Sequence, residues 1–177
     1  MAEKFEEIAV VVDQSSLGNG IYDLTLKTDK IAKAARAGQF VSVYSNDKSK
    51  LLPRPISLCG INRDEDTIRL VYRVTGEGTG TEEFSKLVMG DKVRLLGPLG
   101  NGFTVQPGKK AFLIGGGIGV PPMLQLAKDI NAGIVQTPGE EKTGKKITLL
   151  GVLWSIIAVA AIVGNIFYVG MDEAFLV

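Results

Sequence analysis

The chain has 177 residues, of which 45% are hydrophobic and 22% are charged, with a net charge of +1 and a pI of about 7.8. This composition is typical of a folded globular protein, and the balanced charge argues against a broad nucleic-acid-binding surface. The absence of histidine excludes a Ser-His-Asp triad, and the single cysteine can form no internal disulfide. We therefore expect a cytoplasmic protein whose chemistry depends on a bound cofactor.

Short β-type segments follow one another between residues 6 and 96, separated by turn residues. They are EIAVVVD (7–13), GIYDLTLKT (20–28), GQFVSVYS (38–45), PISLCGI (55–61), TIRLVYRV (67–74) and DKVRLLG (91–97). Spacing of this kind predicts an antiparallel barrel or sandwich. One helical segment interrupts them, TEEFSKLV (81–88), with Thr79 or Thr81 as its N-cap and Gly90 just past its end.

The pattern changes after residue 105. The segment AFLIGG (111–116) is a continuous apolar strand of the type found in buried parallel sheets, and PPMLQLAKDI (121–130) follows as a helix with prolines in its first turn. This β-loop-α unit places a domain boundary near residues 105–110. We therefore predict a barrel domain over 1–105 and a truncated α/β nucleotide-binding domain over 110–177.

An uncharged run extends from Ile147 to Gly170 within this second part. It is long enough for a membrane-spanning helix, and the lysines before it with the acidic residues after it would leave the N-terminal part on the cytoplasmic side. Its β-branched residues and glycines fit equally well a buried strand followed by a core helix of the second domain. Both interpretations stay open.

The strand that begins at Arg54 has the residue types that a phosphate-binding strand needs. The guanidinium of Arg54 offers a planar fork of donors that matches a phosphate group. Pro55 restricts the backbone, and Ser57 points to the same face of the strand as the proline. The four residues taken alone fit better with a surface arginine and an edge-strand proline, because short motifs match by chance.

Two glycine-rich segments strengthen the case for a dinucleotide site. The strand LVYRV (70–74) puts Tyr72 on one face, runs into TGEGT (75–79), and leads to a helix where backbone N–H groups can approach an anion. The alternative is a turn that only reverses the chain. The segment GGGIGVPP (115–122) lies between a strand and a helix, as in nucleotide loops, although it matches neither G-x-G-x-x-G nor a P-loop.

Together, and in this order, four segments resemble the ferredoxin-reductase-like flavoproteins, most of all the electron-transfer subunits of NAD-linked dihydroorotate dehydrogenases. The segments are RPISLCG (54–60), LVYRVTGEGTG (70–80), GDKVRLLGPLGNGF (90–103) and IGGGIGVPPMLQLAK (114–128). The resemblance covers residues 5 to 130. It implies a Greek-key FAD-binding barrel followed by an NAD-binding domain. It also implies a flavin-dependent oxidoreductase that passes electrons between NAD(H) and a catalytic dihydroorotate dehydrogenase subunit in pyrimidine biosynthesis.

The resemblance also implies two sets of site residues. The first set would hold FAD, from its phosphates to its reactive ring: Arg54, Pro55, Ile56, Ser57, Val71, Tyr72, Arg73, Gly78 and Thr79. The second set would receive the nicotinamide end of NAD: Gly115, Gly116, Gly117, Ile118, Gly119 and Pro121. Arg54 would pair with the FAD phosphates, Ser57 would lie near the reactive N5 edge, and Cys59 would be a packing residue beside the flavin.

The sequence departs from the family pattern in its second half. The family subunit carries a cysteine cluster that holds a 2Fe-2S centre, whereas this chain has only Cys59 and cannot supply four thiolates. Residues 111–177 are also fewer than a complete NAD-binding domain needs. A second hypothesis therefore stays open, in which the protein is a non-catalytic or membrane-tethered flavin-binding module without hydride transfer.

Overall fold

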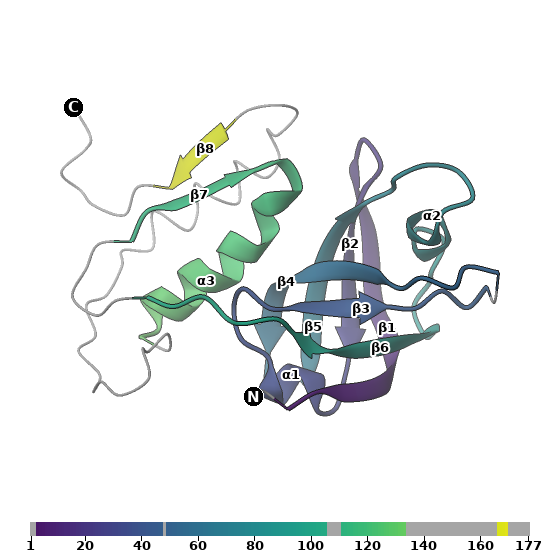
Figure 1. Cartoon of the computed structure of the whole chain (residues 1–177), viewed down its shortest axis with the longest axis horizontal. Coiled ribbons are helices and arrows are strands. Elements are labelled where there is room, and N and C mark those ends of the chain that lie inside the picture. Colours follow the sequence, from purple (N-terminus) through teal and green to yellow (C-terminus); the bar gives the residue numbers. More distant parts are fainter. Residues whose placement is uncertain (1–2, 48, 106–110, 134–165, 170–177) are drawn as a thin grey trace.

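The computed structural model describes residues 3–47, 49–105, 111–133 and 166–169. Antiparallel strands close into a barrel in the order β1-β2-β5-β4-β3-β6 (Figure 1). The strands are β1 (Phe5–Gly18), β2 (Ile21–Lys27), β3 (Phe40–Val43), β4 (Arg54–Asn62), β5 (Thr67–Arg73) and β6 (Lys92–Leu99). Each strand overlaps one of the β-type segments in the sequence, so the prediction of an antiparallel barrel is confirmed.

The alternation of apolar and polar residues explains why these strands close around a core. Leu24 and Leu26 of β2 are fully buried, and in register they face Leu70 and Ile68 of β5, which are buried as well. The side chains between them point outward, because successive residues of a strand face opposite sides. Each such leucine or isoleucine contributes about 1.5 to 3 kcal/mol by leaving water.

Strand β4 contains a bulge that makes its central part unusual. Its register against β5 shifts between Leu58 and Gly60, so that Leu58, Cys59 and Gly60 are buried one after another. Leu58 belongs to the barrel core, and the thiol of Cys59 is free and only 1% exposed. Burial raises the pKa of Cys59 to about 11, so the thiol is protonated at neutral pH.

A short helix, α1 (Ile31–Ala34), follows β2 and was not expected from the sequence. The carboxylate of Glu7 on β1 accepts hydrogen bonds from the backbone N–H groups of Lys30 (2.7 Å) and Ile31 (3.3 Å). A side chain far away in the sequence therefore satisfies the first amides of this helix. No local sequence pattern reveals such a contact.

The second helix, α2 (Gly80–Phe84), begins where the sequence predicts, because Thr79 is its N-cap. The prediction that it continues to the vicinity of Gly90 was wrong. The carbonyl of Phe84 accepts hydrogen bonds from the N–H of Leu87 (3.1 Å) and from the side-chain amide of Gln14 on β1 (3.0 Å), so a tighter turn takes the place of the next helical bond. The helix therefore ends after little more than one turn.

A smaller unit follows the barrel, as drawn beside β4 in Figure 1. Its elements are β7 (Leu113–Gly116), the 3-10 turn η1 (Gly117–Gly119), α3 (Pro121–Asn131) and β8 (Ile166–Val169). The strand β7 forms as expected, but its partner β8 is antiparallel, so the expected parallel pairing is not found in the described part of the chain. Phe112 and Ile114 are 68% and 57% exposed, which shows that this strand is not buried on both faces.

Helix α3 is tied to the barrel by two buried polar side chains, Gln125 and Asp129. The Oε1 atom of Gln125 accepts a hydrogen bond from the backbone N–H of Ile61 on β4 (2.8 Å), and its Nε2 donates to Oδ1 of Asp129 (2.6 Å). Burial raises the pKa of Asp129, while the bond from Gln125 and the charge of Arg63 oppose that shift. These contacts fix α3 against β4.

Two sequence-based predictions fall largely outside the described residues. The proposed boundary at 105–110 includes residues 106–110, and of the uncharged run 147–170 only the four residues of β8 are described. None of the helices that the structure describes is long and apolar enough to span a membrane.

Candidate functional site

Arg54 is the first residue of β4 and pairs in register with Val43 of β3. Its half-buried side chain runs along the start of α2, so closely that a Cβ atom at Gly80 would lie 3.4 Å from its Nε. No hydrogen bond or ion pair to another described residue holds the guanidinium. A partly buried cation with free donors is better satisfied by an anion, so this arrangement favours an anionic ligand.

The next three residues of β4 alternate between the two faces of the strand. Pro55 and Ser57 are exposed on the outer face, and the hydroxyl of Ser57 makes no hydrogen bond within the described part of the protein. Ile56 is 6% exposed and belongs to the barrel core. Contact between Ile56 and a ligand on the outer face could therefore come only from its backbone.

Strand β5 pairs with β4 and presents a second group of expected site residues. Val71 and Arg73 lie on the outer face, and no other described residue bonds to the exposed guanidinium of Arg73. Tyr72 points into the core, where its ring stacks on Tyr22 (centroids 5.8 Å apart) and its hydroxyl donates to Gln14 (3.1 Å). Burial raises the pKa of Tyr72. Its ring is thus turned away from the outer face.

The turn between β5 and α2 is held by threonine hydroxyls. The hydroxyl oxygen of Thr81 accepts a hydrogen bond from the N–H of Thr75 (3.0 Å) and lies 2.9 Å from the hydroxyl of Thr79. Thr79 donates to the carbonyl of Gly76 (2.7 Å), so its proton is already used within the turn. Gly78 has a φ of +72°, and a Cβ atom there would meet nothing within 4 Å, which leaves open space beside it.

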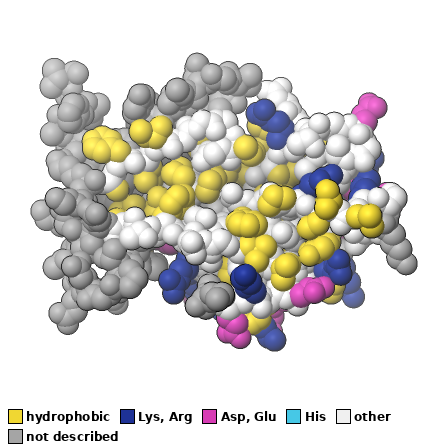
Figure 2. All heavy atoms as spheres, viewed as in Figure 1, with side chains coloured by type: hydrophobic (Ala, Val, Ile, Leu, Met, Phe, Trp, Pro, Cys, Tyr) yellow, Lys and Arg dark blue, Asp and Glu magenta, His cyan; other side chains and the backbone are white. Residues whose placement is uncertain are grey.

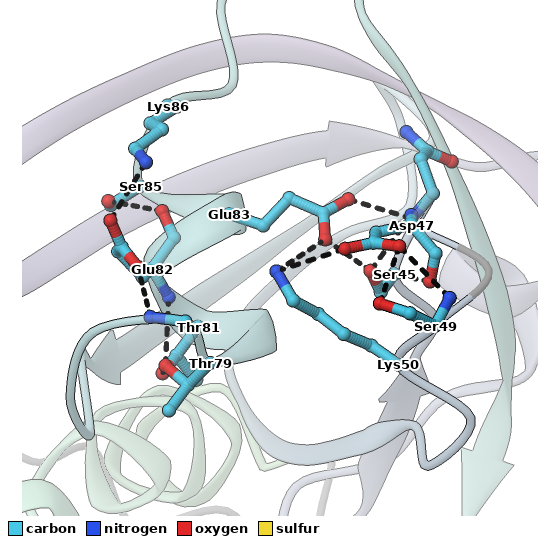
Figure 3. Close-up of polar contacts among 12 residues, drawn as sticks. Ser45, Asp47, Ser49, Lys50, Thr79, Thr81, Glu82, Glu83, Ser85 and Lys86 are labelled. Atoms are coloured by element: carbon cyan, nitrogen blue, oxygen red, sulfur yellow. Dashed lines mark hydrogen bonds and ion pairs between the residues drawn. The ribbon is translucent and has the colours of Figure 1, made fainter.

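A carboxylate already contacts this turn, as Figure 3 shows. The Oε2 atom of Glu82 accepts a hydrogen bond from the N–H of Gly78 (2.5 Å), and Oε1 accepts one from Nζ of Lys86 (2.8 Å). The bonds from Lys86 and Gly78 lower the pKa of Glu82. The amide of Gly78 is therefore oriented toward an anionic oxygen. No pattern in the sequence indicates Glu82, because its partner amide becomes its neighbour only when the turn folds.

The glycine-rich segment after β7 forms a tight turn. A Cβ atom at Gly115 would lie 3.0 Å from the carbonyl oxygen of Gly119 and 3.0 Å from Cα of Val120. Contacts this close are tighter than nearly all real Cβ contacts, so any side chain at this position would require the backbone of the turn to shift. The turn thereby brings the end of β7 directly onto the start of α3.

The rest of this segment presents accessible backbone. A Cβ atom would meet nothing within 4 Å at Gly116, Gly117 or Gly119, and Ile118 is 45% exposed. Pro121 is buried as the first residue of α3. The turn η1 packs against β5, so this segment lies beside the strand that presents Val71 and Arg73 outward.

The structure thus brings together groups that are distant in the sequence. Arg54 meets the turn 75–79 through Gly80, and the segment 115–119 meets β5 through η1. On the face shown in Figure 2, Lys and Arg side chains are separated by apolar and uncharged atoms and form no continuous basic surface. A phosphate group would therefore be held by local contacts rather than by a broad field. No cluster that could hold a metal ion occurs among the described residues.

Known proteins with similar sequences share this part of the chain. The profile of the oxidoreductase FAD-binding domain family matches residues 9–103. The electron transfer subunit of dihydroorotate dehydrogenase B (NAD(+)) from Enterococcus faecalis is 42% identical over 132 residues, covering 73% of this chain and 49% of the relative. The same subunit from Streptococcus mutans is 45% identical over 128 residues, covering 71% and 48%. The chain spans about half the length of these curated relatives.

A solved structure shows the same arrangement in three dimensions. An NADH-dependent reduced ferredoxin-NADP oxidoreductase, studied for flavin-based electron bifurcation, matches with a TM-score of 0.62 at 27% identity, covering 69% of this chain and 43% of that chain. That share of this chain is larger than residues 9–103, so the likeness extends beyond the residues that the family profile matches.

Proposed function

The chain belongs to the oxidoreductase FAD-binding domain family, and we propose that its barrel binds FAD and passes electrons between NAD(H) and a catalytic dihydroorotate dehydrogenase subunit. The relatives that carry the name of a dihydroorotate dehydrogenase B electron transfer subunit support this choice of partner. The proposed role is that of a flavin-dependent oxidoreductase subunit in pyrimidine biosynthesis.

The position of Arg54 is the observation that carries this proposal. Its guanidinium has no partner among the described residues and lies along Gly80, at the end of the turn in which the amide of Gly78 already binds a carboxylate oxygen. A pyrophosphate offers anionic oxygens that match a guanidinium fork and a backbone donor. Bound FAD would supply the redox chemistry, taking a hydride from NADH and releasing electrons to an acceptor.

The outer face of β4 and β5 would position the FAD ring. Ser57 offers to a polar edge of the ring a hydroxyl that makes no hydrogen bond among the described residues, and Arg73 adds a second guanidinium without a partner among them. Val71 is only 6% exposed, so its side chain supports the strand rather than offering a surface to the ring. Ile56 and Tyr72 act from the core, where their packing fixes the backbone of the two strands. In this arrangement the strands are the rigid support on which precise positioning depends.

We assign the nicotinamide end of NAD to the segment 115–119 together with Pro121. The open backbone at three of its glycines and its packing against β5 support this assignment. A nicotinamide ring bound there would lie beside the strand that presents Val71 and Arg73 outward. Direct hydride transfer needs the two rings in contact, so this placement satisfies a basic requirement of the reaction.

A 2Fe-2S cluster does not fit this chain. Such a cluster needs four ligands, usually thiolates, and Cys59 is the single cysteine of the sequence. The thiol of Cys59 is buried, and its pKa is raised to about 11 by burial, so it is a poor ligand even on its own.

Titration of the purified full chain with FAD, followed by flavin fluorescence, tests the first step. Arg54→Ala should weaken binding by about 2 to 4 kcal/mol, roughly 30-fold to 1,000-fold, because charge-assisted hydrogen bonds are lost. Arg94→Ala is a matched control, since Arg94 is paired with Glu6 (3.3 Å) and lies over the ring of Tyr44. A folded chain that binds no FAD, or an Arg54→Ala variant with unchanged affinity, contradicts the proposal.

Anaerobic mixing of the FAD-loaded chain with NADH tests the second step. We expect the flavin absorbance to bleach as the hydride is transferred. A loaded chain that remains oxidised would instead support the alternative hypothesis of a flavin-binding module without hydride transfer.

A further inference from the structure

Glu83 lies next to Glu82 on α2, but its carboxylate points toward the loop between β3 and β4 (Figure 3). Its Oε1 accepts a hydrogen bond from the backbone N–H of Asn46 (2.7 Å), and its Oε2 accepts one from the hydroxyl of Ser45. The same Oε2 lies 3.5 Å from Nζ of Lys50, and these two side chains are only 23% and 21% exposed. One carboxylate therefore joins α2 to three residues of this loop.

The loop that Glu83 contacts is itself a compact turn. The Oδ1 atom of Asp47 accepts hydrogen bonds from the N–H (2.9 Å) and the hydroxyl (2.8 Å) of Ser49, and the N–H of Lys50 donates to the carbonyl of Asp47 (3.0 Å). The side-chain amide of Asn46 also donates to the carbonyl of Lys92 on β6 (3.2 Å). Because the turn is internally bonded, fixing it at Glu83 fixes it as a unit.

This contact joins the two segments that carry the proposed phosphate site. The loop leads into Arg54, and α2 begins at Gly80, along which the Arg54 side chain lies. Leu51 and Leu52, between the compact turn and Arg54, are 84% and 73% exposed, so core packing does not anchor this stretch. The opposite end of α2 is held separately, by Gln14.

We propose that Glu83 is a positioning residue for phosphate binding, which holds Arg54 and the turn 75–79 at the separation that a pyrophosphate needs without touching the cofactor. This inference rests on the proposed FAD function. Simple electrostatics predicts the opposite sign of effect, because removing a carboxylate near a phosphate site should strengthen the binding of an anion. A positioning role predicts that removing Glu83 weakens it.

Glu83→Ala and Glu82→Ala form a matched pair, since they remove the same charge from adjacent positions of one helix. Glu83→Ala should raise the Kd for FAD about tenfold, because two hydrogen bonds and an ion pair to the loop are lost. Glu82→Ala should leave the Kd unchanged or lower it, because Glu82 competes for the amide of Gly78. Glu83→Gln keeps one acceptor oxygen and should recover part of the affinity.

Ser45→Ala breaks the same contact from the loop side. The loss of FAD affinity in the double variant Ser45→Ala/Glu83→Ala should be smaller than the sum of the two single losses, because the two side chains share a hydrogen bond. The loss can exceed that of Glu83→Ala alone, because the Ser45 hydroxyl also accepts a hydrogen bond from the N–H of Asp47 (3.0 Å). In the FAD-free protein, hydrogen exchange of the amides of Asn46, Asp47, Ser49 and Lys50 should be faster in Glu83→Ala and unchanged in Glu82→Ala.

The inference is overturned if Glu83→Ala binds FAD as tightly as the unaltered chain, or if Glu82→Ala weakens binding as much as Glu83→Ala does. If the unaltered chain binds no FAD, the proposed function fails instead. Amide exchange in the unliganded variants then still shows whether Glu83 holds the loop.

Discussion

The barrel and the β7–α3 unit differ in how much of the packing that stabilises each of them comes from its own residues. Every barrel strand pairs with two neighbours, and the enclosed core includes large side chains that are fully buried, such as Phe84 and Leu24. Leu113 and Leu126 of the β7–α3 unit form a small core with Ala37, which precedes β3, and the unit also depends on polar contacts with β4. A closed sheet completes its own core, whereas a single β-loop-α unit needs a neighbour to complete one.

Truncating one aliphatic side chain to alanine in each region tests this difference most directly. Leu70→Ala, in the barrel core, should lower the free energy of unfolding by about 2 to 5 kcal/mol because it leaves a cavity. Ile114→Ala, on the exposed side of β7, should change it by less than about 0.5 kcal/mol. Urea unfolding followed by circular dichroism measures both free energies of unfolding. Equal decreases in the two variants would contradict the difference between the barrel and the β7–α3 unit.

The contact between the two regions can be removed with Gln125→Met, which keeps the approximate size of the side chain. The backbone N–H of Ile61 and the carboxylate of Asp129 then lose a partner, at a cost of about 1 to 3 kcal/mol. Lys128→Met, on the exposed side of the same helix, is the matched control. Hydrogen exchange at the Ile61 amide should quicken only in Gln125→Met; equal exchange in both variants would show that Gln125 does not join the regions.

The charge of Asp129 should make the same contact depend on pH. Burial raises its pKa in the folded protein, so its favourable contribution to stability is fully present below the unfolded pKa near 3.8 and is lost as the pH rises through the folded value. Asp129→Asn keeps an acceptor for Gln125 without the charge and should raise the Tm at pH 7, with little change near pH 3. A lower Tm at pH 7 would mean that the attraction to Arg63 and the hydrogen bond from the backbone of Ala37 together outweigh the burial cost.

The smallest effect is expected from labelling Cys59, which needs no substitution. Its thiol lies in the bulge of β4, between the two regions, and reports whether they separate. With a pKa of about 11 and 1% exposure, it should react slowly with a thiol reagent at pH 8 in the native protein and rapidly in urea. Fast labelling of the native chain would indicate that α3 separates readily from β4.

The sequence predicted the barrel well, because the alternation of apolar and polar residues indicates which residues of each strand are buried. Leu24, Leu26 and Ile68 each lie between two polar residues in their strands, and each of them is buried in the core. The length of α2 and the presence of α1 could not be predicted in this way. Both depend on side chains of β1, Gln14 and Glu7, which approach these helices only after the chain has folded.

The candidate site shows the same limit. Residue types and order were enough to suggest Arg54 and Ser57, and strand alternation placed Tyr72 opposite Val71 and Arg73. Alternation also places Ile56 on the inner face, opposite to Pro55 and Ser57, where the structure has it. No pattern in the sequence indicated a role for Glu83, because the residues that bond to its carboxylate are more than thirty positions away in the chain.

Closure of the barrel also affects how copies of the protein can associate. Every strand from β1 to β6 has a paired neighbour on each side over at least part of its length, so none of them is an edge strand along its whole length. Among the described strands, only β7 and β8 are edge strands, because they form a two-stranded sheet. Misassembly at high concentration should therefore start at β7–β8, and native barrels should persist inside the resulting aggregates.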